Sequence, residues 1–433
     1  MLFRYSPDAR GKAVRKAVIY TKEEHGIRRE LIDPDALRII THLRNYGFDA
    51  YIVGGAVRDM LIGKKPKDFD IVTGAEPAKI KRLFRNSRII GKRFRLVHIF
   101  FGQKIFEVST FRSLVDGTTG NSFGTMDEDV QRRDFTLNAL YYDPVREQVV
   151  DYVGGVRDIR TRKIKPVIPL ATIFQDDPVR MLRAIKYAAS TGCSIPFMLK
   201  RAIRKNSVLL QPVSPSRLTE EIIKILNSGK AKPIISSALQ FDLFMYLQPQ
   251  ANNLIDDYRD FARSYEKSLE ALDSLVSSGE ETRLGRKLVY LVKDFIQLIT
   301  DMSGNPSEVY AKVYAECRRF IMPMNPPRVE LEYAVKYSLK ELGVNVRPPR
   351  QRDRKTSDAA AKDRTGRDKA GRGATGRGAT GRDKAAREAT DRGATGRPGL
   401  AAIDTANVPA EEKARPARRR RSRKKTAPIS ASN

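Results

Sequence analysis

The pattern of hydrophobic and polar positions changes from strand-like to helical along this chain. Between residues 49 and 112, short apolar runs and alternating segments are typical of strands, and residues 56–62 fit a short helix. Upstream, Asp33-Pro34 is expected to start an amphipathic helix. One expected strand ends at residue 53, and three others cover residues 68–73, 95–101 and 104–110.

From about residue 171 onward, apolar residues recur with almost purely helical spacing. The helices are expected at 177–190, 197–205, 215–227, 234–246, 253–277, 283–301, 307–321 and 328–341. Strands followed by a run of helices predict an α+β protein, in which an α/β head precedes a helical body.

The composition changes again near Val346. Residues 347–433 contain 25 Lys and Arg against 10 Asp and Glu, no aromatic residue and very few large aliphatic residues. Such a segment buries too little apolar surface to offset its chain entropy, so we predict a disordered basic tail. The tail is either a solubilising segment or a weak RNA contact.

The net charge of +30 favours a polyanionic partner, either nucleic acid or an anionic membrane. With two Cys and three widely separated His residues, a disulfide scaffold, a four-Cys zinc site and a His-based metal cage are not expected. No apolar run reaches 18 residues and no apolar signal core opens the chain. These features predict a reduced, cytoplasmic protein without a membrane span.

Paired acidic residues are the first chemical signal. If residues 68–73 form a strand, Asp68 and Asp70 project from one face, and Phe69 points into the core. Two adjacent carboxylates repel each other unless a cation lies between them, and Mg²⁺ prefers carboxylates combined with waters and substrate phosphates. Asp68 and Asp70 are therefore candidate metal ligands.

A glycine pair precedes these acids by 13 residues. Gly54 and Gly55 stand at an expected strand-to-helix turn, where backbone amides and a helix N-terminus favour phosphate. Arg58, one helical turn further, is able to donate to phosphate oxygens. Residues 152–158 nearly repeat this motif, but no Asp-x-Asp follows them, so we interpret the second copy as a structural turn.

The segment GGAVRDMLIGKKPKDFDIVT resembles the signature of the class II nucleotidyltransferases of the polymerase-β superfamily, which include bacterial poly(A) polymerases and CCA-adding enzymes. The resemblance implies a polymerase-β-like head in which Asp68 and Asp70 are the catalytic metal carboxylates. It also implies a third catalytic carboxylate at Glu107, which would share a strand face with Ile105 and Ser109. Glu107 is otherwise an ordinary exposed strand residue.

A second block, Arg132–Ala139, resembles the family motif that holds the ribose and triphosphate. Arg133 would donate to phosphate and Asp134 would accept from ribose hydroxyls. Asn138, four residues later, is expected on the same helical face as Asp134. The alternative is a helix start capped by Asp134.

A third block contains Asp177 and Arg180, which correspond to the family pair that reads the Watson–Crick edge of the incoming base. A carboxylate acceptor beside a guanidinium donor complements adenine and cytosine, whereas guanine and uracil present the opposite order. The pair therefore predicts A or C without choosing between them. Its alternative is an intrahelical ion pair. On a later helix, Arg217 and Glu221 are four residues apart and would be able to pair on one face; we interpret them mainly as a brace between head and body.

The run Ile89–Leu96 with His98 is similar to the stretch that separates bacterial poly(A) polymerases from CCA-adding enzymes. Lys92, Arg93 and Arg95 would form a positive strip that meets RNA or triphosphate, unless they belong to a solvated basic loop. His98 is expected to be structural.

These observations lead to one prediction of function with two alternatives. We expect a polynucleotide adenylyltransferase that adds AMP from ATP to RNA 3′ ends without a template, using two Mg²⁺ ions and releasing pyrophosphate in mRNA polyadenylation or RNA turnover. The alternatives are a CCA-adding tRNA nucleotidyltransferase and an inactive RNA-binding homologue. The expected regions are an N-terminal extension (1–30), the head (31–165), a nucleotide-reading helical neck (166–230), a helical RNA-binding body (231–346) and the disordered tail (347–433).

Overall fold

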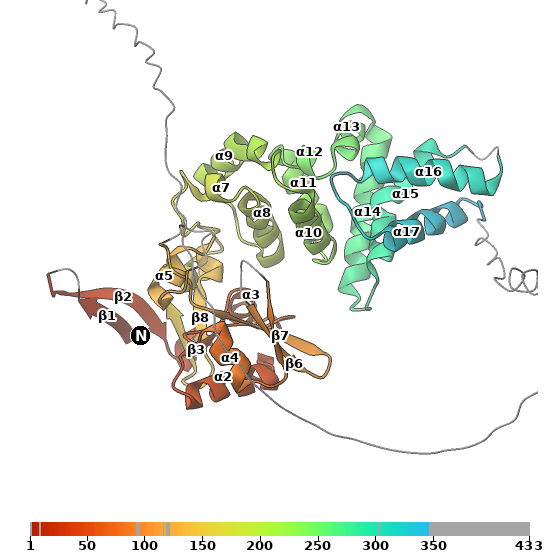
Figure 1. The fold of residues 1–433 in the computed structure, drawn as a ribbon. Coiled ribbons are helices and arrows are strands. Elements are labelled where there is room, and N and C mark those ends of the chain that lie inside the picture. Colours follow the sequence, from red (N-terminus) through yellow and green to blue (C-terminus); the bar gives the residue numbers. More distant parts are fainter. Residues whose placement is uncertain are drawn as a thin grey trace, which may run out of the picture. The chain divides into compact units, whose positions relative to one another are not determined.

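Short apolar strands from distant parts of the sequence assemble into one sheet in the computed structural model, which describes residues 2–7, 10–91, 96–115, 117, 122–301 and 304–345 (Figure 1). Among these residues the sheet has nine strands in the order β1-β2-β9-β8-β3-β4-β7-β6-β5. All neighbours are antiparallel except β4 and β7, which are parallel. The strands are β1 Leu2–Pro7, β2 Ala13–Tyr20, β3 Ala50–Val53, β4 Asp70–Thr73, β5 Ser87–Ile90, β6 Leu96–Phe101, β7 Lys104–Thr110, β8 Leu140–Asp143 and β9 Gln148–Asp151.

The helices of the head are interleaved with these strands (Figure 1). Helix α2 begins at Pro34, and the carboxylate of Asp33 accepts from the Asp35 amide at 2.8 Å, so this predicted start is confirmed. The head helices are α1 Lys22–His25, η1 Arg29–Leu31, α2 Pro34–Asn45, α3 Gly55–Leu61, α4 Pro77–Leu83, α5 Met126–Gln131, η2 Thr136–Asn138 and α6 Gly155–Arg160.

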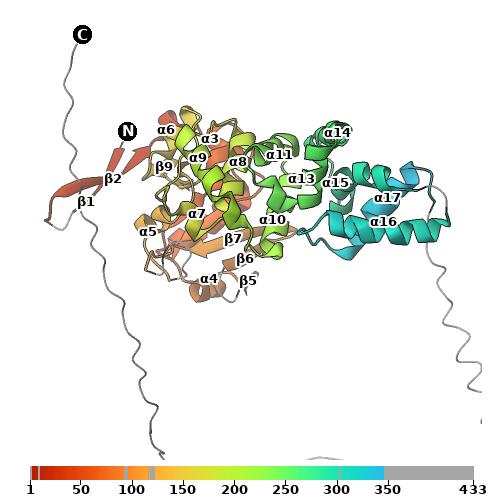
Figure 2. The same ribbon diagram turned by 90° about the horizontal axis from the view of Figure 1, so that it is seen from above.

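From residue 173 onward the described elements are all helical (Figure 2). They are α7 Ile173–Asp176, α8 Arg180–Thr191, α9 Phe197–Asn206, η3 Ser207–Leu210, α10 Pro215–Leu226, α11 Ala231–Gln240, α12 Phe244–Leu247, α13 Pro249–Asp257, α14 Arg259–Ser277, α15 Leu284–Ile299, α16 Pro306–Phe320 and α17 Arg328–Glu341. The predicted α+β class, with a head followed by a helical body, is confirmed.

Two predicted helices are each divided in two. The prediction 234–246 becomes α11 and α12, because Asp242 adopts a left-handed φ of 57° that interrupts the helix. The prediction 253–277 becomes α13 and α14, because Tyr258 is extended between them. A third prediction, 177–190, starts too early: Asp177 precedes Pro178, is held extended at φ −152°, and α8 begins only at Arg180.

The strands β1, β2, β5, β8 and β9 were not predicted. β8 and β9 contain four residues each, and all but one of these eight residues are buried. A four-residue apolar run carries too little periodicity to separate a strand from a turn or a helix. The predicted strands 95–101 and 104–110 are confirmed as β6 and β7, within one residue at a single end.

The two faces of the head sheet pack into different cores. In β3, Ile52 belongs to the large core that continues into the helical body, whereas Tyr51 and Val53 point into a smaller core on the opposite face. The smaller core also contains Val72 of β4 and Phe111, which follows β7. The face of β3, β4 and β7 that forms this smaller core also leads to the pocket described below.

The helical body is held together by close helix packing. Helix α15 contacts α14, α16 and α17, and the rings of Phe295 and Phe320 stack with centroids 4.0 Å apart. Cys193 and Cys317 are buried free thiols.

Three further expectations concern the division into regions, the C-terminal tail and membrane spans. The described residues all belong to one compact unit, Met1–Arg350, and its subdivision into head, neck and body stays a prediction. The predicted disordered tail lies outside the described residues. In the part of the chain that is described, no helix combines the length and the apolar character needed to cross a bilayer.

The second glycine pair is a structural turn, as predicted. Asp151 ends β9, is 2% exposed, and its carboxylate accepts hydrogen bonds of 2.8–3.1 Å from the four backbone amides of Val153–Val156 at the start of α6. Gly155 is required here because a Cβ would lie 2.2 Å from the carbonyl oxygen of Thr136. The carboxylate therefore satisfies the amides that the sharp turn leaves without helical partners.

We predict that Asp151→Asn lowers the free energy of unfolding by about 1–3 kcal/mol, because the amide replaces a charged acceptor of four N–H groups with one neutral acceptor and one donor. Urea unfolding followed by circular dichroism measures the change. The control is Asp260→Asn, whose side chain is fully exposed. Equal unfolding midpoints for the two variants would contradict the prediction.

Candidate active site

A pocket of about 730 Å³ lies beside the point where β3 ends and β4 begins. Its lining combines carboxylates and guanidinium groups with few apolar residues. The lining residues are Val53, Asp70, Leu96, Glu107, Ser109, Arg112, Asp129, Arg132, Arg133, Asp176, Asp177, Arg180 and Arg217.

The sheet brings two predicted catalytic carboxylates together. In the parallel pairing of β4 with β7, Asp70 is the register partner of Glu107, and both line the pocket. Ser109 lines it too, so the predicted shared face of Glu107 and Ser109 is confirmed. His98 on β6 is the antiparallel partner of Glu107, and its Nε2 lies 3.5 Å from Glu107 Oε1.

Asp68 occupies a different position from Asp70. Strand β4 begins at Asp70, two residues later than predicted, and Asp68 is an exposed residue of the preceding segment. Phe69 is 8% exposed and packs into the large core, as predicted. Asp68 is not among the lining residues of the pocket, but its charge acts on Asp70.

The charged form of the Asp70 side chain is disfavoured by its surroundings. Its side chain is reached by solvent through the pocket, yet the surrounding protein desolvates it, and the negative charges of Glu107 and Asp68 add to that effect. Together these causes raise the pKa of Asp70 to about 6, against an opposing contribution from Arg133. A carboxylate destabilised by like charges suits a bound cation.

Within the described residues, no group of three or more His, Cys, Asp or Glu side chains is arranged to hold a metal ion by itself. The donor set at this place is the Asp70 carboxylate with Glu107 and Asp68 acting on it. Such a set fits Mg²⁺, which commonly binds through one or two protein carboxylates and completes its shell with waters and substrate phosphates.

Three sequence motifs meet at Gly54. This glycine adopts a φ of 68°, and a Cβ there would lie 3.8 Å from Arg133 Nη1 and 3.9 Å from Asp70 Oδ2. The glycine turn, the arginine of the second block and the acidic strand thus form one corner, beside the N-terminus of α3 at Gly55.

Arg133 is fixed in this corner by buried partners. Its Nη2 donates to Asp129 Oδ2 at 2.9 Å and its Nε donates to the Tyr141 hydroxyl at 3.0 Å. The Tyr141 hydroxyl in turn donates to Asp129 at 2.6 Å. Although burial alone lowers it, the pKa of Arg133 is raised by the neighbouring Tyr141 and Asp129, so the guanidinium stays charged.

Arg58 and Asn138 lie elsewhere than the pocket lining. Arg58 Nη1 donates to Asn138 Oδ1 at 2.9 Å, its Nε donates to Asp59 at 2.9 Å, and its guanidinium lies over the ring of Tyr187. Arg58 lines a separate cavity of about 190 Å³. The phosphate and nucleotide roles expected of Arg58 and Asn138 stay predictions.

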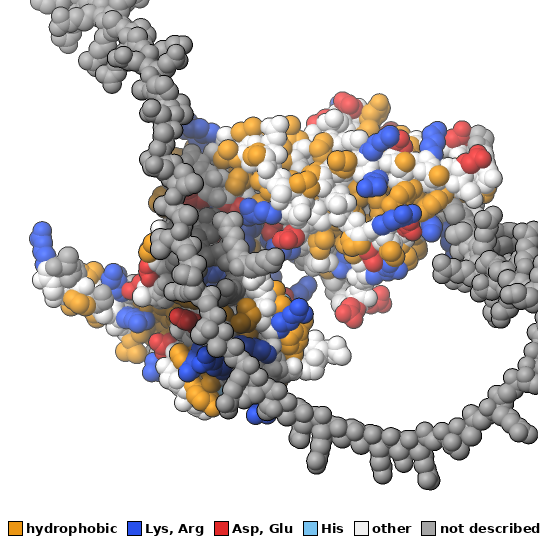
Figure 3. Space-filling view, in the orientation of Figure 1, with side chains coloured by type: hydrophobic (Ala, Val, Ile, Leu, Met, Phe, Trp, Pro, Cys, Tyr) orange, Lys and Arg blue, Asp and Glu red, His pale blue; other side chains and the backbone are white. Residues whose placement is uncertain are grey.

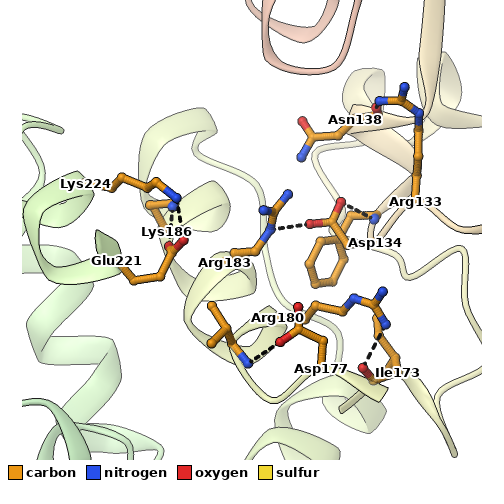
Figure 4. A network of polar contacts seen from close by, with 12 residues as sticks. Arg133, Asp134, Asn138, Ile173, Asp177, Arg180, Arg183, Lys186, Glu221 and Lys224 are labelled. Atoms are coloured by element: carbon orange, nitrogen blue, oxygen red, sulfur yellow. Dashed lines mark hydrogen bonds and ion pairs between the residues drawn. The ribbon is translucent and has the colours of Figure 1, made fainter. Parts of the chain in front are cut away.

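The prediction that Asp134 and Asn138 share one face of a helix is wrong. Phe135 is extended, with φ −130° and ψ 145°, and fully buried, so no helix connects the two residues. Instead, Asp134 Oδ2 accepts from Arg183 Nε of α8 at 2.6 Å, as Figure 4 shows. Asp134 is 6% exposed and joins the head to the helix that follows.

Asp177 and Arg180 also line the pocket, and Figure 4 shows them beside Ile173. The alternative prediction, an ion pair within one helix, is wrong because Asp177 is extended and precedes the start of α8. Both carboxylate oxygens of Asp177 accept from Arg217 Nη2 at 2.9 Å, whereas Arg180 Nη1 donates to the carbonyl of Ile173 at 3.2 Å. Burial lowers the pKa of Arg180, as it does for Arg112 and Arg132 on the same pocket.

The expected Arg217–Glu221 pair is also wrong. Arg217 reaches Asp177, and Glu221 accepts from Lys186 at 2.7 Å and from Lys224 at 2.8 Å (Figure 4). Arg217 thus contacts the segment before α8, whereas Glu221, 4% exposed, is paired with Lys186 of α8 and with Lys224 of its own helix.

Sequence reasoning missed Arg112, Asp129, Arg132 and Arg217 as pocket residues. Arg112 had a signal, since it follows the strand that carries Glu107. A signal for Asp129 was its position four residues before Arg133, a spacing at which an acidic and a basic side chain are able to pair. Lys92, Arg93 and Arg95, the predicted RNA-binding strip, lie outside the described residues.

Comparison with known proteins agrees with this architecture. Residues 50–165 match the family described as "Poly A polymerase head domain", and residues 194–255 match "Probable RNA and SrmB- binding site of polymerase A". Poly(A) polymerase I of Escherichia coli O6:H1 is 35% identical over 331 residues, which cover 72% of this chain and 67% of that protein.

Two further relatives show how far the similarity extends. Poly(A) polymerase I of Salmonella typhimurium is 38% identical over 286 residues, which cover 62% of this chain and 60% of that protein. The CCA-adding enzyme of Bacillus licheniformis is 34% identical over 218 residues, covering 49% and 55% respectively. With its acidic strand pair and its buried arginines in one pocket, the chain belongs to the family of tRNA nucleotidyltransferases and bacterial poly(A) polymerases, and it is a nucleotidyltransferase.

Proposed function

We propose that this nucleotidyltransferase adds AMP from ATP to the 3′ ends of RNA without a template, in mRNA polyadenylation or RNA turnover. The observation that carries the proposal is the corner at which Gly54, Arg133 and Asp70 meet, because it combines a phosphate donor with a carboxylate that suits a cation. A nucleoside triphosphate requires both at the same place.

The triphosphate would lie against the basic side of this corner. Arg133 is held in one orientation by Asp129, Tyr141 and the Asn138 carbonyl, and the N–H groups that these partners do not use would donate to phosphate oxygens. Arg112 and Arg132 add buried positive charge to the same pocket. Asp134, Arg58 and Asn138 do not line the pocket, and nucleotide binding by these three residues stays a prediction.

The reacting end would lie against the acidic side. Asp70, Glu107 and Asp68 are the proposed catalytic carboxylates, and Asp70 and Asp68 would hold the divalent metal ions. When bound, two Mg²⁺ ions supply Lewis-acid stabilisation of the phosphates and lower the pKa of the attacking 3′-hydroxyl. Asp70 and Glu107 orient that end of the site because they come from neighbouring strands of a rigid sheet.

The proposed reaction balances as a phosphoryl transfer. The RNA 3′-oxygen forms a bond to the α-phosphorus of ATP, the bond from that phosphorus to the β-phosphate oxygen breaks, and pyrophosphate leaves with its electron pair. The proton of the 3′-hydroxyl passes to solvent.

Base selection would come from Asp177 and Arg180. Asp177 would accept from the exocyclic amino group of the base, and Arg180 would donate to the adjacent ring nitrogen. Both line the pocket, and Arg217 orients the Asp177 carboxylate through two hydrogen bonds. Guanine and uracil would place an acceptor against Asp177 and a donor against Arg180, and this mismatch costs about 1–3 kcal/mol or more.

Two observations support poly(A) synthesis over CCA addition. The relatives named poly(A) polymerase I match up to 72% of this chain, whereas the CCA-adding relative matches 49%. The Ile89–Leu96 stretch is also similar to that of poly(A) polymerases. The family match at residues 194–255, which covers α9 to α12 and most of α13, supports an RNA-binding role for that region.

We predict that Asp70→Asn lowers the rate of AMP incorporation into a short RNA by at least about 10²-fold, because it removes a carboxylate charge that would hold the metal ions which stabilise the reacting phosphates. Gel analysis with radiolabelled ATP measures the rate, and fluorescence anisotropy measures RNA binding, which should be retained. Asp260→Asn, on an exposed helix surface, is the control and should behave as wild type. An Asp70→Asn protein as active as its control would support the inactive, RNA-binding alternative.

We also predict which nucleotides are used. With a generic RNA and each of the four triphosphates in turn, ATP should give long tails and GTP and UTP should give at least about tenfold less product. The same assay on a tRNA that lacks its CCA end distinguishes the enzyme alternatives. Addition of two C residues and one A, restricted to that tRNA, would establish CCA addition in place of poly(A) synthesis.

A further inference from the structure

We propose that the N-terminal hairpin of β1 and β2, hereafter the N-terminal arm (Leu2–Tyr20), binds single-stranded RNA through Phe3, Tyr5 and Arg15. The inference rests on the proposed function only in that RNA is the substrate. It adds a surface outside the pocket, at the far edge of the head sheet, where β1 is the outermost strand.

The pairing of the two strands places these three side chains on one face. Tyr5 is the register partner of Arg15, and Phe3 shares its face because it is two residues from Tyr5. The guanidinium of Arg15 lies 5.2 Å from the centroid of the Phe3 ring, and the Phe3 and Tyr5 rings are 6.4 Å apart. Two aromatic rings and a guanidinium plane therefore follow one another along the arm, which is how stacking platforms for unpaired bases are built.

The opposite face anchors the arm to the head. Arg4 Nη1 donates to the Tyr152 hydroxyl at 2.9 Å, and Ala17, the partner of Arg4 across the hairpin, is 2% exposed in the smaller core. Phe3 and Tyr5 are instead 41% and 58% exposed. The arm thus holds exposed rings on a surface whose other side is fixed, so less side-chain and backbone freedom is lost when a ligand binds.

The charge of the arm specifies a polyanion. Between Leu2 and Tyr20 the sequence contains five basic residues and one acidic residue. Four of the basic residues, Arg10, Lys12, Arg15 and Lys16, are on the exposed stretch of residues 10–16. Figure 3 shows basic and hydrophobic side chains side by side on this arm. Basic groups that follow a backbone, next to rings that accept bases, match a single strand of RNA.

The same features oppose the other use of an edge strand, which is pairing with a strand of another protein. The register shifts between Arg4 and Tyr5, so that Lys16 has no partner across the hairpin, and β1 ends in Pro7. A bulge, a proline and exposed basic side chains are the devices by which sheet edges avoid adding a further strand. Single-stranded RNA is therefore the occupant that the arm fits.

The test compares the binding of a fluorescent 20-nucleotide oligoadenylate to the full chain and to the variant F3A/Y5A, by anisotropy. We expect the variant to bind at least about tenfold more weakly, because two stacking rings are lost. Binding of a blunt RNA duplex should change less than about twofold, since its bases are already stacked and only the phosphates are available. The matched control is L2A/V14A, which removes exposed apolar side chains from the opposite face of the arm and should bind both RNAs as wild type does.

Wild-type affinity of F3A/Y5A for the oligoadenylate, or an equal loss for single-stranded and duplex RNA, would overturn the proposal. If F3A/Y5A does not fold, Arg15→Gln decides: it should weaken single-strand binding about threefold and lower the slope of log Kd against log salt by about 1. An unchanged affinity and slope would count against the arm. The measurements read binding alone, so a protein that transfers no AMP contradicts the proposed function without affecting this result.

Discussion

The site depends on one constraint, the parallel pairing of β4 with β7, which holds Asp70 beside Glu107. Every other neighbouring strand pair of the described sheet is antiparallel, and this pair brings together carboxylates from segments 37 positions apart. With Asp68 close by, burial and like charge raise the pKa of Asp70 to about 6. The sheet maintains this unfavourable arrangement because the alternate residues of both strands, such as Ile71 and Val108, are fully buried.

The basic half of the pocket is built differently, since two of its arginines are oriented by partners within the protein. Arg133 is fixed by Asp129 and Tyr141, and Arg217 is paired with Asp177. Such pairing removes the entropy cost of ordering long side chains when a triphosphate binds. The acidic and basic groups come close at Gly54, which has a positive φ of 68° and adjoins both Arg133 and Asp70.

The contacts between the head and the helices after it explain why base reading and phosphate binding belong to one site. Asp134 of the head binds Arg183 of α8, the helix that starts at Arg180. The wall expected to read the base is therefore tied to the segment that carries Arg133. The N-terminal arm lies at the other end of the sheet, so RNA held there and the reacting 3′ end would occupy separate surfaces of the head.

The sequence by itself determined the α+β order, the acidic strand, the glycine turn and the helical body, because these follow from local periodicity and turn chemistry. Glu107 was identified through the family resemblance, and the alternation of β7 agreed with it. Tertiary structure decided the partners. Asp177 binds Arg217 instead of pairing within a helix, and Asp134 is separated from Asn138 because the buried Phe135 is extended. Side-chain partners depend on which segments pack together. A spacing of three or four residues predicts a contact only when both residues lie in the same helix.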